Sequence, residues 1–381
     1  MLRVLLRSLF ALVVAAAAVL IGWRVLRPAE VLASVHPPYP KVPAVWPHVT
    51  GRTPVAPLLV DDRVRVYASK RQIRADAPIN ANSVRTAIWS FRRWPEQLSG
   101  VVATGRTVIS RWSDGDLVAI DGDTGKIVWR AQGPSAPGYS GHRTGAATVW
   151  GPENLRVAGP SVLVTAGGQI FSYEVSTGTR RWTSATACDD GFTTAGGQLV
   201  CPSGAVDAVT GATVASFPAG PYTPVGCDVA WSACAGLRDA AGHGWLTGGA
   251  TPVRAAALDR PDATVAAGLV FYPSGDSLRS VDPRTGAVRH DYPAAQVLGA
   301  AAGRVVLLTG DRTLLVIDPR SGQTLASYPL AYLTEGLTWD PGRWQVTDRF
   351  VAVERLARDR PDDPDTAGYY FSVDTVVLAE L

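Results

Sequence analysis

Apolar runs that end in a polar turn closed by glycine recur along the chain from about residue 84 to the C-terminus. The run "TLLVID" at 313–318 leads into "PRSG", and the segment 281–286 reads "VDPRTG" in the same order. After each turn comes a further run that contains an aromatic residue. Strands joined by tight turns in this way predict a series of β-hairpins.

The turns share one form, in which an acidic residue stands four positions before a glycine that is itself preceded by Thr or Ser. Five copies are present, and their acidic and glycine residues are Asp121 and Gly125, Glu174 and Gly178, Asp207 and Gly211, Asp282 and Gly286, and Asp318 and Gly322. An Asp side chain can accept hydrogen bonds from the turn amides, and Gly adopts the φ > 0 conformation that closes the loop. We therefore interpret these residues as structural, rather than as metal ligands or acid–base groups.

From Gly178 onward the copies recur with a nearly constant period, and each copy is followed by an aromatic residue. With a degenerate copy, "WLTGG" at 245–249, the mean period from Gly178 to Gly322 is 36 residues. The aromatic residues are Trp129, Trp182, Phe217, Tyr292 and Tyr328. The first two stand four positions after their glycine and the other three stand six after, so all point to the same face of a strand. We expect one aromatic side chain per unit to dock against the neighbouring unit.

A hairpin unit of about 36 residues that buries an aromatic side chain against its neighbour is typical of a β-propeller blade. The segments "VAIDGDTGKIVW" (118–129), "VDPRTG" (281–286) and "VIDPRSG" (316–322) resemble the repeats of the pyrroloquinoline-quinone-like β-propeller superfamily. The resemblance covers about 84–381. This superfamily includes quinoprotein alcohol dehydrogenases and the propeller lipoprotein of the outer-membrane assembly machinery, so the resemblance implies an all-β propeller and leaves the function open.

The number of blades depends on how the ring closes. The segment that ends at Trp94 resembles an outermost strand, whereas the last unit has no outer strand of its own. If the strand ending at Trp94 completes the C-terminal blade, the ring has seven blades and no exposed edge. If "PLLVDDRVRVYAS" (57–69) builds an extra blade, the ring has eight.

The N-terminus predicts export from the cytoplasm. Arg3 and Arg7 flank the start of a run without charged residues, which extends to Trp23. We interpret residues 1–27 as an uncleaved signal-anchor that forms a transmembrane helix, with the rest of the chain on the extracytoplasmic side of the cytoplasmic membrane. A cleaved signal peptide is the alternative, because "VLA" at 31–33 offers a cleavage site.

Composition indicates the boundaries of the stalk and of the propeller. Eight prolines in 28–57 predict an extended stalk, which leaves 58–381 for the propeller. The net charge of +3 is spread along the chain and provides no basic patch, so we expect no nucleic-acid partner.

The sequence favours no cofactor, metal or catalytic residue. Quinoprotein enzymes of the superfamily typically hold their cofactor between a Trp and a disulfide of adjacent cysteines, with Ca²⁺ and a catalytic Asp nearby, and this chain has no adjacent cysteines. Its five histidines lack metal-ligand spacing. The acidic stretch 358–368 lacks the spacing of a calcium loop and is interpreted as a solvated excursion between strands.

The segment 132–156 contains an insertion, because Gly125 and Gly178 are 53 residues apart and the mean period is 36. Two interpretations of this insertion remain open. Insertions in repeat proteins tend to gather on a binding face, so the segment is a candidate for partner contact. A spacer loop without a binding role would look the same in the sequence.

All four cysteines fall between residues 188 and 234 of a chain that is expected to enter an oxidising compartment. We predict the pairs Cys188 with Cys201 and Cys227 with Cys234, because each pair brackets one short segment where an inner hairpin of a blade should turn. Buried free thiols and pairing between blades are the alternatives.

Two functions from different classes follow. The first is a non-catalytic, membrane-anchored, extracytoplasmic propeller that acts as a scaffold for an unidentified protein or cell-envelope partner. The second is a small quinoprotein-type dehydrogenase that binds pyrroloquinoline quinone. The absence of adjacent cysteines favours the first.

Overall fold

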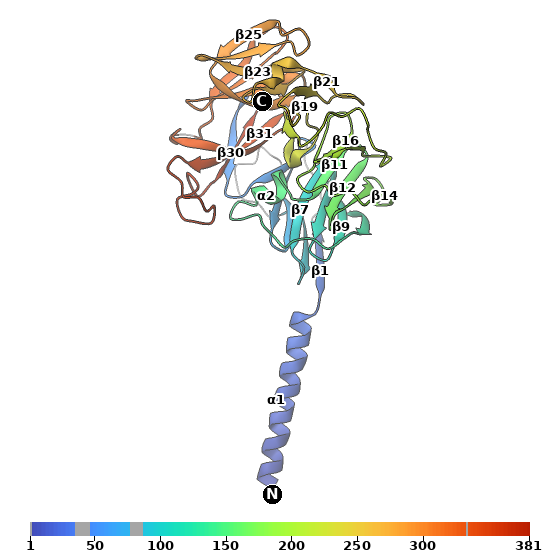
Figure 1. Cartoon of the computed structure of the whole chain (residues 1–381). Helices are drawn as coiled ribbons and strands as arrows, with labels where there is room; N and C mark the ends of the chain where they lie inside the picture. Colours follow the sequence, from blue (N-terminus) through green and yellow to red (C-terminus); the bar gives the residue numbers. More distant parts are fainter. Residues whose placement is uncertain (1, 35–45, 77–86, 333) are drawn as a thin grey trace.

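The chain is an all-β propeller with one long N-terminal helix. The computed structural model describes residues 2–34, 46–76, 87–332 and 334–381, and Figure 1 shows the sheets gathered into a ring from which the helix projects. The described strands form eight antiparallel sheets, one per blade. The alternative of eight blades is therefore confirmed, and the expectation of seven was wrong.

The blades follow the order of the chain. Blade 1 contains β3 (Pro57–Val60), β4 (Val64–Ser69), β5 (Gln72–Asp76) and β6 (Trp89–Trp94), and blade 2 contains β7 (Leu98–Thr104), β8 (Thr107–Trp112), β9 (Asp116–Asp121) and β10 (Ile127–Gln132). Blade 3 contains β11 (Leu155–Ala158), β12 (Ser161–Ala166), β13 (Gln169–Glu174) and β14 (Arg180–Ser184). Blade 4 contains β15 (Phe192–Thr193), β16 (Gln198–Cys201) and β17 (Gly204–Asp207). Blade 5 contains β18 (Thr223–Val225), β19 (Gly236–Arg238), β20 (Gly244–Leu246) and β21 (Val253–Arg254). Blade 6 contains β22 (Thr264–Ala266), β23 (Leu269–Ser274), β24 (Ser277–Val281) and β25 (Val288–Pro293). Blade 7 contains β26 (Ala295–Ala301), β27 (Arg304–Thr309), β28 (Thr313–Ile317) and β29 (Thr324–Pro329). Blade 8 contains β30 (Trp339–Val346), β31 (Phe350–Ala357), β32 (Val376–Glu380) and β2 (His48–Thr53), and the short helices are α2 (Ala146–Trp150), η1 (Val229–Trp231) and η2 (Ala256–Asp259).

An N-terminal strand closes the ring, but it is not the predicted one. β2 pairs with β32 from His48 opposite Glu380 to Thr53 opposite Val376 and becomes the outer strand of blade 8. The strand that ends at Trp94 is β6, which is bound by β5 in blade 1. The prediction failed because "PLLVDDRVRVYAS" forms β3 and β4, whose own blade needs β6 to cover its outer edge.

The N-terminal segment forms α1 (Leu2–Leu26), and β1 (Ala29–Ser34) follows it on the outer edge of blade 1. Among the residues that the structure describes, no helix combines the length and the apolar character needed to cross a membrane. The predicted transmembrane helix is therefore not confirmed. Part of the segment predicted as a stalk is strand, since β1 and β2 both lie within 28–57, and residues 35–45 lie outside the described part of the chain.

Indole rings connect neighbouring blades by covering the glycine of the next repeat turn. A Cβ atom added to Gly178 would lie 2.4 Å from Cε3 of Trp129, and one added to Gly211 would lie 2.8 Å from Cδ2 of Trp182. Trp129 Nε1 also donates a hydrogen bond of 2.6 Å to the carbonyl oxygen of Val175, three residues before Gly178. Each such aromatic–glycine contact joins an outer strand to the hairpin of the following blade.

The same contact occurs at two positions that the sequence analysis did not select. Trp89 covers Gly125 and donates to the carbonyl of Gly122 over 2.7 Å. His290 covers Gly322, with its Nδ1 2.4 Å from an added Cβ. His290 stands four residues after its own turn glycine, as do Trp129 and Trp182, so an imidazole ring occupies the position that an indole ring takes elsewhere.

The three aromatic residues six positions after their glycine pack differently. Tyr292 is buried and lies beside Phe271, with ring centroids 6.2 Å apart. Tyr328 donates its hydroxyl hydrogen to the carbonyl of Glu380 in blade 8 over 2.6 Å. Phe217 is half-buried in a small cluster between blades 4 and 5. The glycine-covering position is therefore the one four residues after the turn.

The repeat turns have the form that their sequence indicates. In the turn that joins β24 and β25, Oδ1 of Asp282 accepts hydrogen bonds from the amides of Arg284 and Thr285, each 3.0 Å long. Gly286 has φ 69°, a conformation that a Cβ would disfavour. The guanidinium of Arg289, followed by these amides, lowers the pKa of Asp282 below its ordinary value.

Candidate functional site

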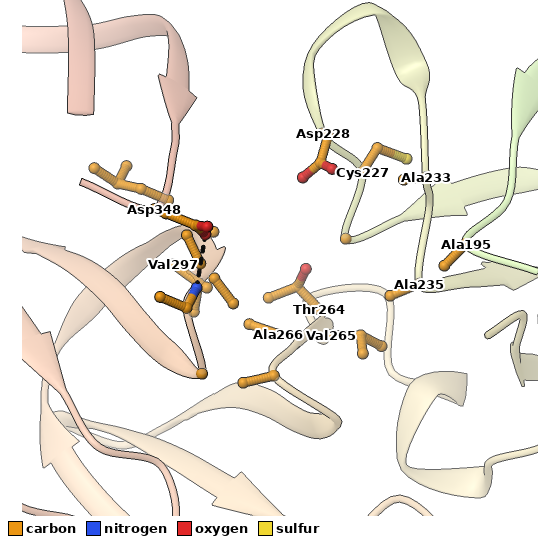
Figure 2. A pocket seen from close by; sticks show the side chains of 18 of the residues that line it. Ala195, Cys227, Asp228, Ala233, Ala235, Thr264, Val265, Ala266, Val297 and Asp348 are labelled. Atoms are coloured by element: carbon orange, nitrogen blue, oxygen red, sulfur yellow. Dashed lines mark hydrogen bonds between the residues drawn. The ribbon is translucent and has the colours of Figure 1, made fainter. Parts of the chain in front are cut away.

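Three adjoining cavities occupy the centre of the ring. Their volumes are about 590, 430 and 480 Å³, and they are lined by residues in or next to β7, β11, β15, β18, β22, β26 and β30, the first strands of seven blades. One residue, Asp228, lines all three cavities. We call this space the central funnel, and Figure 2 shows the first cavity, with Asp228 and Asp348 on two of its sides.

A covalently closed loop enters the central funnel between β18 and β19. Cys227 is bonded to Cys234, and we call residues 227–234 the funnel loop. The amide of Cys234 donates to the carbonyl of Thr193 over 2.8 Å, which ties the end of the loop to blade 4. Three residues of the loop that are not glycine adopt left-handed backbone, namely Ala230 (φ 60°), Trp231 (φ 52°) and Ala233 (φ 48°). Such conformations persist only where the surrounding structure enforces them, and they are often found at functional sites.

Asp228 is an exposed residue that lines the central funnel, and the cavity walls flank its carboxyl group. Desolvation by these walls raises its pKa to about 6. Its backbone amide donates to the carbonyl of Ser232 over 2.8 Å, whereas no hydrogen bond or ion pair within the described residues reaches its side chain. Trp231 belongs to the same loop and is 50% exposed.

Only two other charged side chains line the three cavities within the described residues. Oδ1 of Asp348 accepts a hydrogen bond of 2.9 Å from the amide of Ala302. Arg343 lines the second cavity, and its guanidinium lies against Gly151, 2.1 Å from where a Cβ would stand. The central funnel therefore carries more negative than positive charge.

The second disulfide lies away from the central funnel. Cys188 is bonded to Cys201, with Cα atoms 4.7 Å apart, and both side chains are buried. Of the four cysteines only Cys201 lies in a strand, so neither disulfide joins two directly opposed strand residues. Both close loops in blades 4 and 5, where the strands are shortest.

The structure also brings together two segments that the sequence analysis considered separately, the insertion 132–156 and the excursion that follows β31. His142 Nδ1 lies 3.0 Å from Oδ2 of Asp365. Thr144 donates its hydroxyl hydrogen over 2.9 Å to Oε1 of Glu354, whose pKa is raised by burial. We call this contact between blades 2 and 8 the seam, and a cavity of about 260 Å³ lies within it.

Two buried arginines hold the insertion against the ring. Arg111 donates to the carbonyls of Asn154 and Ser135 over 3.1 and 3.3 Å. Arg156 donates over 3.0 Å to the carbonyl of Gly191 in the next blade. Desolvation lowers the pKa of each guanidinium to about 10. The insertion is thus bound to blade 2 through Arg111 and to blade 4 through Arg156.

Sequence reasoning did not select Asp228 or Trp231. The only sequence signal for them is the cysteine pair that brackets them, because the loop has no repeat motif of its own. The predicted turn residues lie in the hairpins of blades 2, 3, 4, 6 and 7 and do not line the central funnel. Within the part of the chain that the structure describes, no three His, Cys, Asp or Glu side chains are placed to share a metal ion.

Comparison with solved structures gives similar chains at low identity. BamB from Moraxella catarrhalis is 16% identical, with 92% of this chain and 99% of that chain covered and a TM-score of 0.44. Quinohemoprotein alcohol dehydrogenase from Comamonas testosteroni is 15% identical, with coverages of 88% and 76% and a TM-score of 0.40. A europium-containing methanol dehydrogenase is 13% identical, with coverages of 88% and 92% and a TM-score of 0.39.

No curated protein matches the sequence significantly. A family match extends over residues 23–213, half of the chain, and the matching family is described as outer membrane protein assembly factor BamB. With its repeat turns and its eight blades, the chain belongs to this family of quinoprotein-like β-propellers.

Proposed function

We propose that this chain is a non-catalytic scaffold outside the cytoplasm that binds a protein or cell-envelope partner. The observation that carries the proposal is Trp231, half exposed on a disulfide-closed loop in the central funnel. An exposed indole in a concave site is typical of the residues that dominate protein interfaces, and a loop that is already rigid loses little entropy on binding. The description of the family as an assembly factor supports the same function.

Placement outside the cytoplasm is part of the proposal. Two disulfides support it, because such bonds persist in oxidising compartments. The basic N-terminus and the uncharged run after it support export by either a retained anchor or a cleaved signal peptide. Protease added to spheroplasts should degrade the propeller while a cytoplasmic marker survives. Survival of both would place the chain inside the cell.

Photocrosslinking in intact cells tests the scaffold. A photoreactive amino acid in place of Trp231 should give discrete crosslinked species with a partner. The matched control is Val253 at the edge of blade 5, which is 45% exposed and lies outside the central funnel. Equal crosslinking from both positions, or none from position 231, would contradict the scaffold proposal.

The alternative function requires pyrroloquinoline quinone, and the residues of the central funnel do not suit it. This cofactor carries three carboxylates, and the cavities already hold the carboxylates of Asp228 and Asp348, with Arg343 as the one cationic side chain among the described lining residues. Burying like charges side by side is unfavourable. The disulfide in the central funnel spans seven positions and does not join adjacent residues. Titration with the quinone and Ca²⁺ should show no saturable binding, and micromolar affinity with reduction of a dye by alcohols would favour the dehydrogenase instead.

A further inference from the structure

The Asp228 carboxylate is the least compensated charge of the central funnel. It lines all three cavities, whereas the other carboxylate, Asp348, accepts a backbone hydrogen bond. The one cationic group among the described lining residues, Arg343, lies against Gly151 and forms no ion pair with Asp228. A carboxylate that borders a cavity and has no partner among the described residues is free to pair with a cation that enters the cavity.

Apolar and aromatic residues line a cavity that this carboxylate also borders. Trp231 and Trp344 line the same cavity of about 430 Å³, together with Val229 and Leu298. Trp344 is fixed because its Nε1 donates to the carbonyl of Leu298. Indole rings accept the aliphatic stem of a basic side chain as well as its charged end. A cavity lined by one unpaired carboxylate and two indole rings therefore matches a long cationic side chain.

The dimensions of the central funnel indicate more than one residue of ligand. Cavities of about 430 to 590 Å³ exceed the volume of one side chain and fall in the range of ligand pockets. The disulfide between Cys227 and Cys234 and the hydrogen bond from the Cys234 amide to blade 4 hold the funnel loop, with Asp228 and Trp231, in place before a ligand arrives. Such a site favours a segment of polypeptide that carries the basic side chain into the cavity.

We propose that the central funnel binds an arginine or lysine side chain of an extended partner segment, with its charged end paired to Asp228 and its stem packed against Trp231 and Trp344. This inference rests on the proposed scaffold function and specifies the chemistry of the partner.

A peptide titration tests the site directly. The probe is a capped glycine pentapeptide with Arg at its centre, added to the purified full chain while the indole N–H signals of Trp231 and Trp344 are followed by NMR. Binding should be saturable, and Asp228→Asn should weaken it about tenfold, as expected for loss of a charge-assisted hydrogen bond. The matched control is Asp282→Asn, which removes the same charge from a repeat turn outside the central funnel and should leave the affinity unchanged.

A series of related peptides shows whether the charge or the shape of the central side chain determines binding. Replacing Arg by citrulline, which has the same shape without the charge, should weaken binding to the wild-type chain as much as Asp228→Asn does. Lysine in place of arginine should retain binding. Equal affinity for the arginine and citrulline peptides, or no binding of the arginine peptide at about 10 mM, would overturn the cation site. Tighter binding of spermidine than of the peptide would overturn a polypeptide segment as the occupant.

The result of the peptide titration can be distinguished from the result of the crosslinking experiment that tests the scaffold. If crosslinking from position 231 persists in cells while Asp228→Asn leaves peptide binding unchanged, the scaffold stands and the cation site is wrong. If the peptide binds as expected while position 231 gives no crosslinks in cells, the cation site stands and the scaffold is wrong.

Discussion

Blades 6 and 7 and blades 4 and 5 of the same ring are held together in different ways. The strands of blade 7 are five to seven residues long, whereas those of blade 5 have two or three residues. Between blades 6 and 7, His290 covers the glycine of the next turn. In blades 4 and 5, two disulfides close loops around short strands. The comparison indicates that covalent bonds compensate for a short hydrogen-bonded ladder.

The same difference determines where a site can form. A regular blade commits nearly all its backbone to strands and tight turns, so it has little chain left to fill the centre of the ring. Blade 5 instead extends ten residues from β18 to β19, and its disulfide holds them in the central funnel. Blades 4 and 5, which we call the irregular arc, therefore carry both the exposed indole of Trp231 and the unpaired carboxylate of Asp228.

The largest effect is expected where an aromatic–glycine contact is blocked. Gly178→Ala places a Cβ 2.4 Å from Trp129 at φ 71°, so overpacking and left-handed backbone should together cost about 4 kcal/mol. The control is Gly286→Ala, which has φ 69° and no atom within 4 Å of the added Cβ, and should cost about 1.5 kcal/mol. Urea unfolding curves measure both, and equal losses would show that the contact does not stabilise the ring.

Removal of a disulfide should act on the irregular arc. Replacing Cys188 and Cys201 by Ala should destabilise the protein by about 3 kcal/mol, and replacing Cys227 and Cys234 by about 2.5 kcal/mol, because the second loop is shorter. Hydrogen exchange should accelerate first in blades 4 and 5 and leave blade 7 protected. Uniform acceleration around the ring would contradict a local role for the two bonds.

Two aspartates should respond to pH with opposite signs. The folded-state pKa of Asp228 is raised to about 6, so its charge destabilises the fold above that pH, and the effect disappears below the ordinary value of 3.8. Asp228→Asn should therefore stabilise the protein at pH 7.5 by about 1 kcal/mol, a figure discounted for the solvent access of the carboxyl group. Asp348 and Arg343 are the other charged groups that line these cavities within the described residues, and Asp228→Asn leaves both of them in place.

Asp282 provides the opposite case. Its pKa is lowered, so its contribution is present at neutral pH and is lost as pH falls below the ordinary value. Asp282→Asn should therefore reduce the melting temperature at pH 7.5 and have no effect under strongly acidic conditions. Changes of the same sign in the two variants would show that the two carboxyl groups do not differ as described.

The smallest effect is expected for Trp231→Ala. The indole is half exposed and the funnel loop is closed by its disulfide, so the free energy of unfolding should change by less than about 0.5 kcal/mol. Differential scanning calorimetry checks this. A loss comparable to that of a buried aromatic side chain would mean that Trp231 stabilises the ring rather than serving as a binding residue.

The repeats could be predicted from the sequence because their determinants are local. A turn such as 282–286 requires an Asp that accepts two amides and a Gly with positive φ within five residues, and both are visible in the sequence. Trp129 and Trp182 could be selected as docking residues because they stand at a constant distance from such a turn. Sequence spacing alone did not separate them from Tyr292 and Tyr328, since positions four and six after the turn point to the same face of a strand.

Other features depended on contacts between distant segments. Closure by β2 joins residues 48–53 to 376–380, and no local pattern distinguishes that strand from β6. His290 takes the place of an indole ring because it fits over Gly322 of the next blade, and the seam forms because the ring brings Glu354 to the insertion.

The sequence by itself determined the all-β architecture, the period of the blades and the positions of the turns, because hydrophobic alternation and turn chemistry act over a few residues. Only the tertiary structure decided the number of blades and the strand that closes the ring, because these follow from covering every sheet edge at once. The tertiary structure also determined the pKa of Asp228. An aspartate in a turn and an aspartate in the central funnel are the same letter in the sequence. Their pKa values differ because the cavity walls desolvate Asp228, whereas the Arg289 guanidinium and the turn amides stabilise the charged form of Asp282.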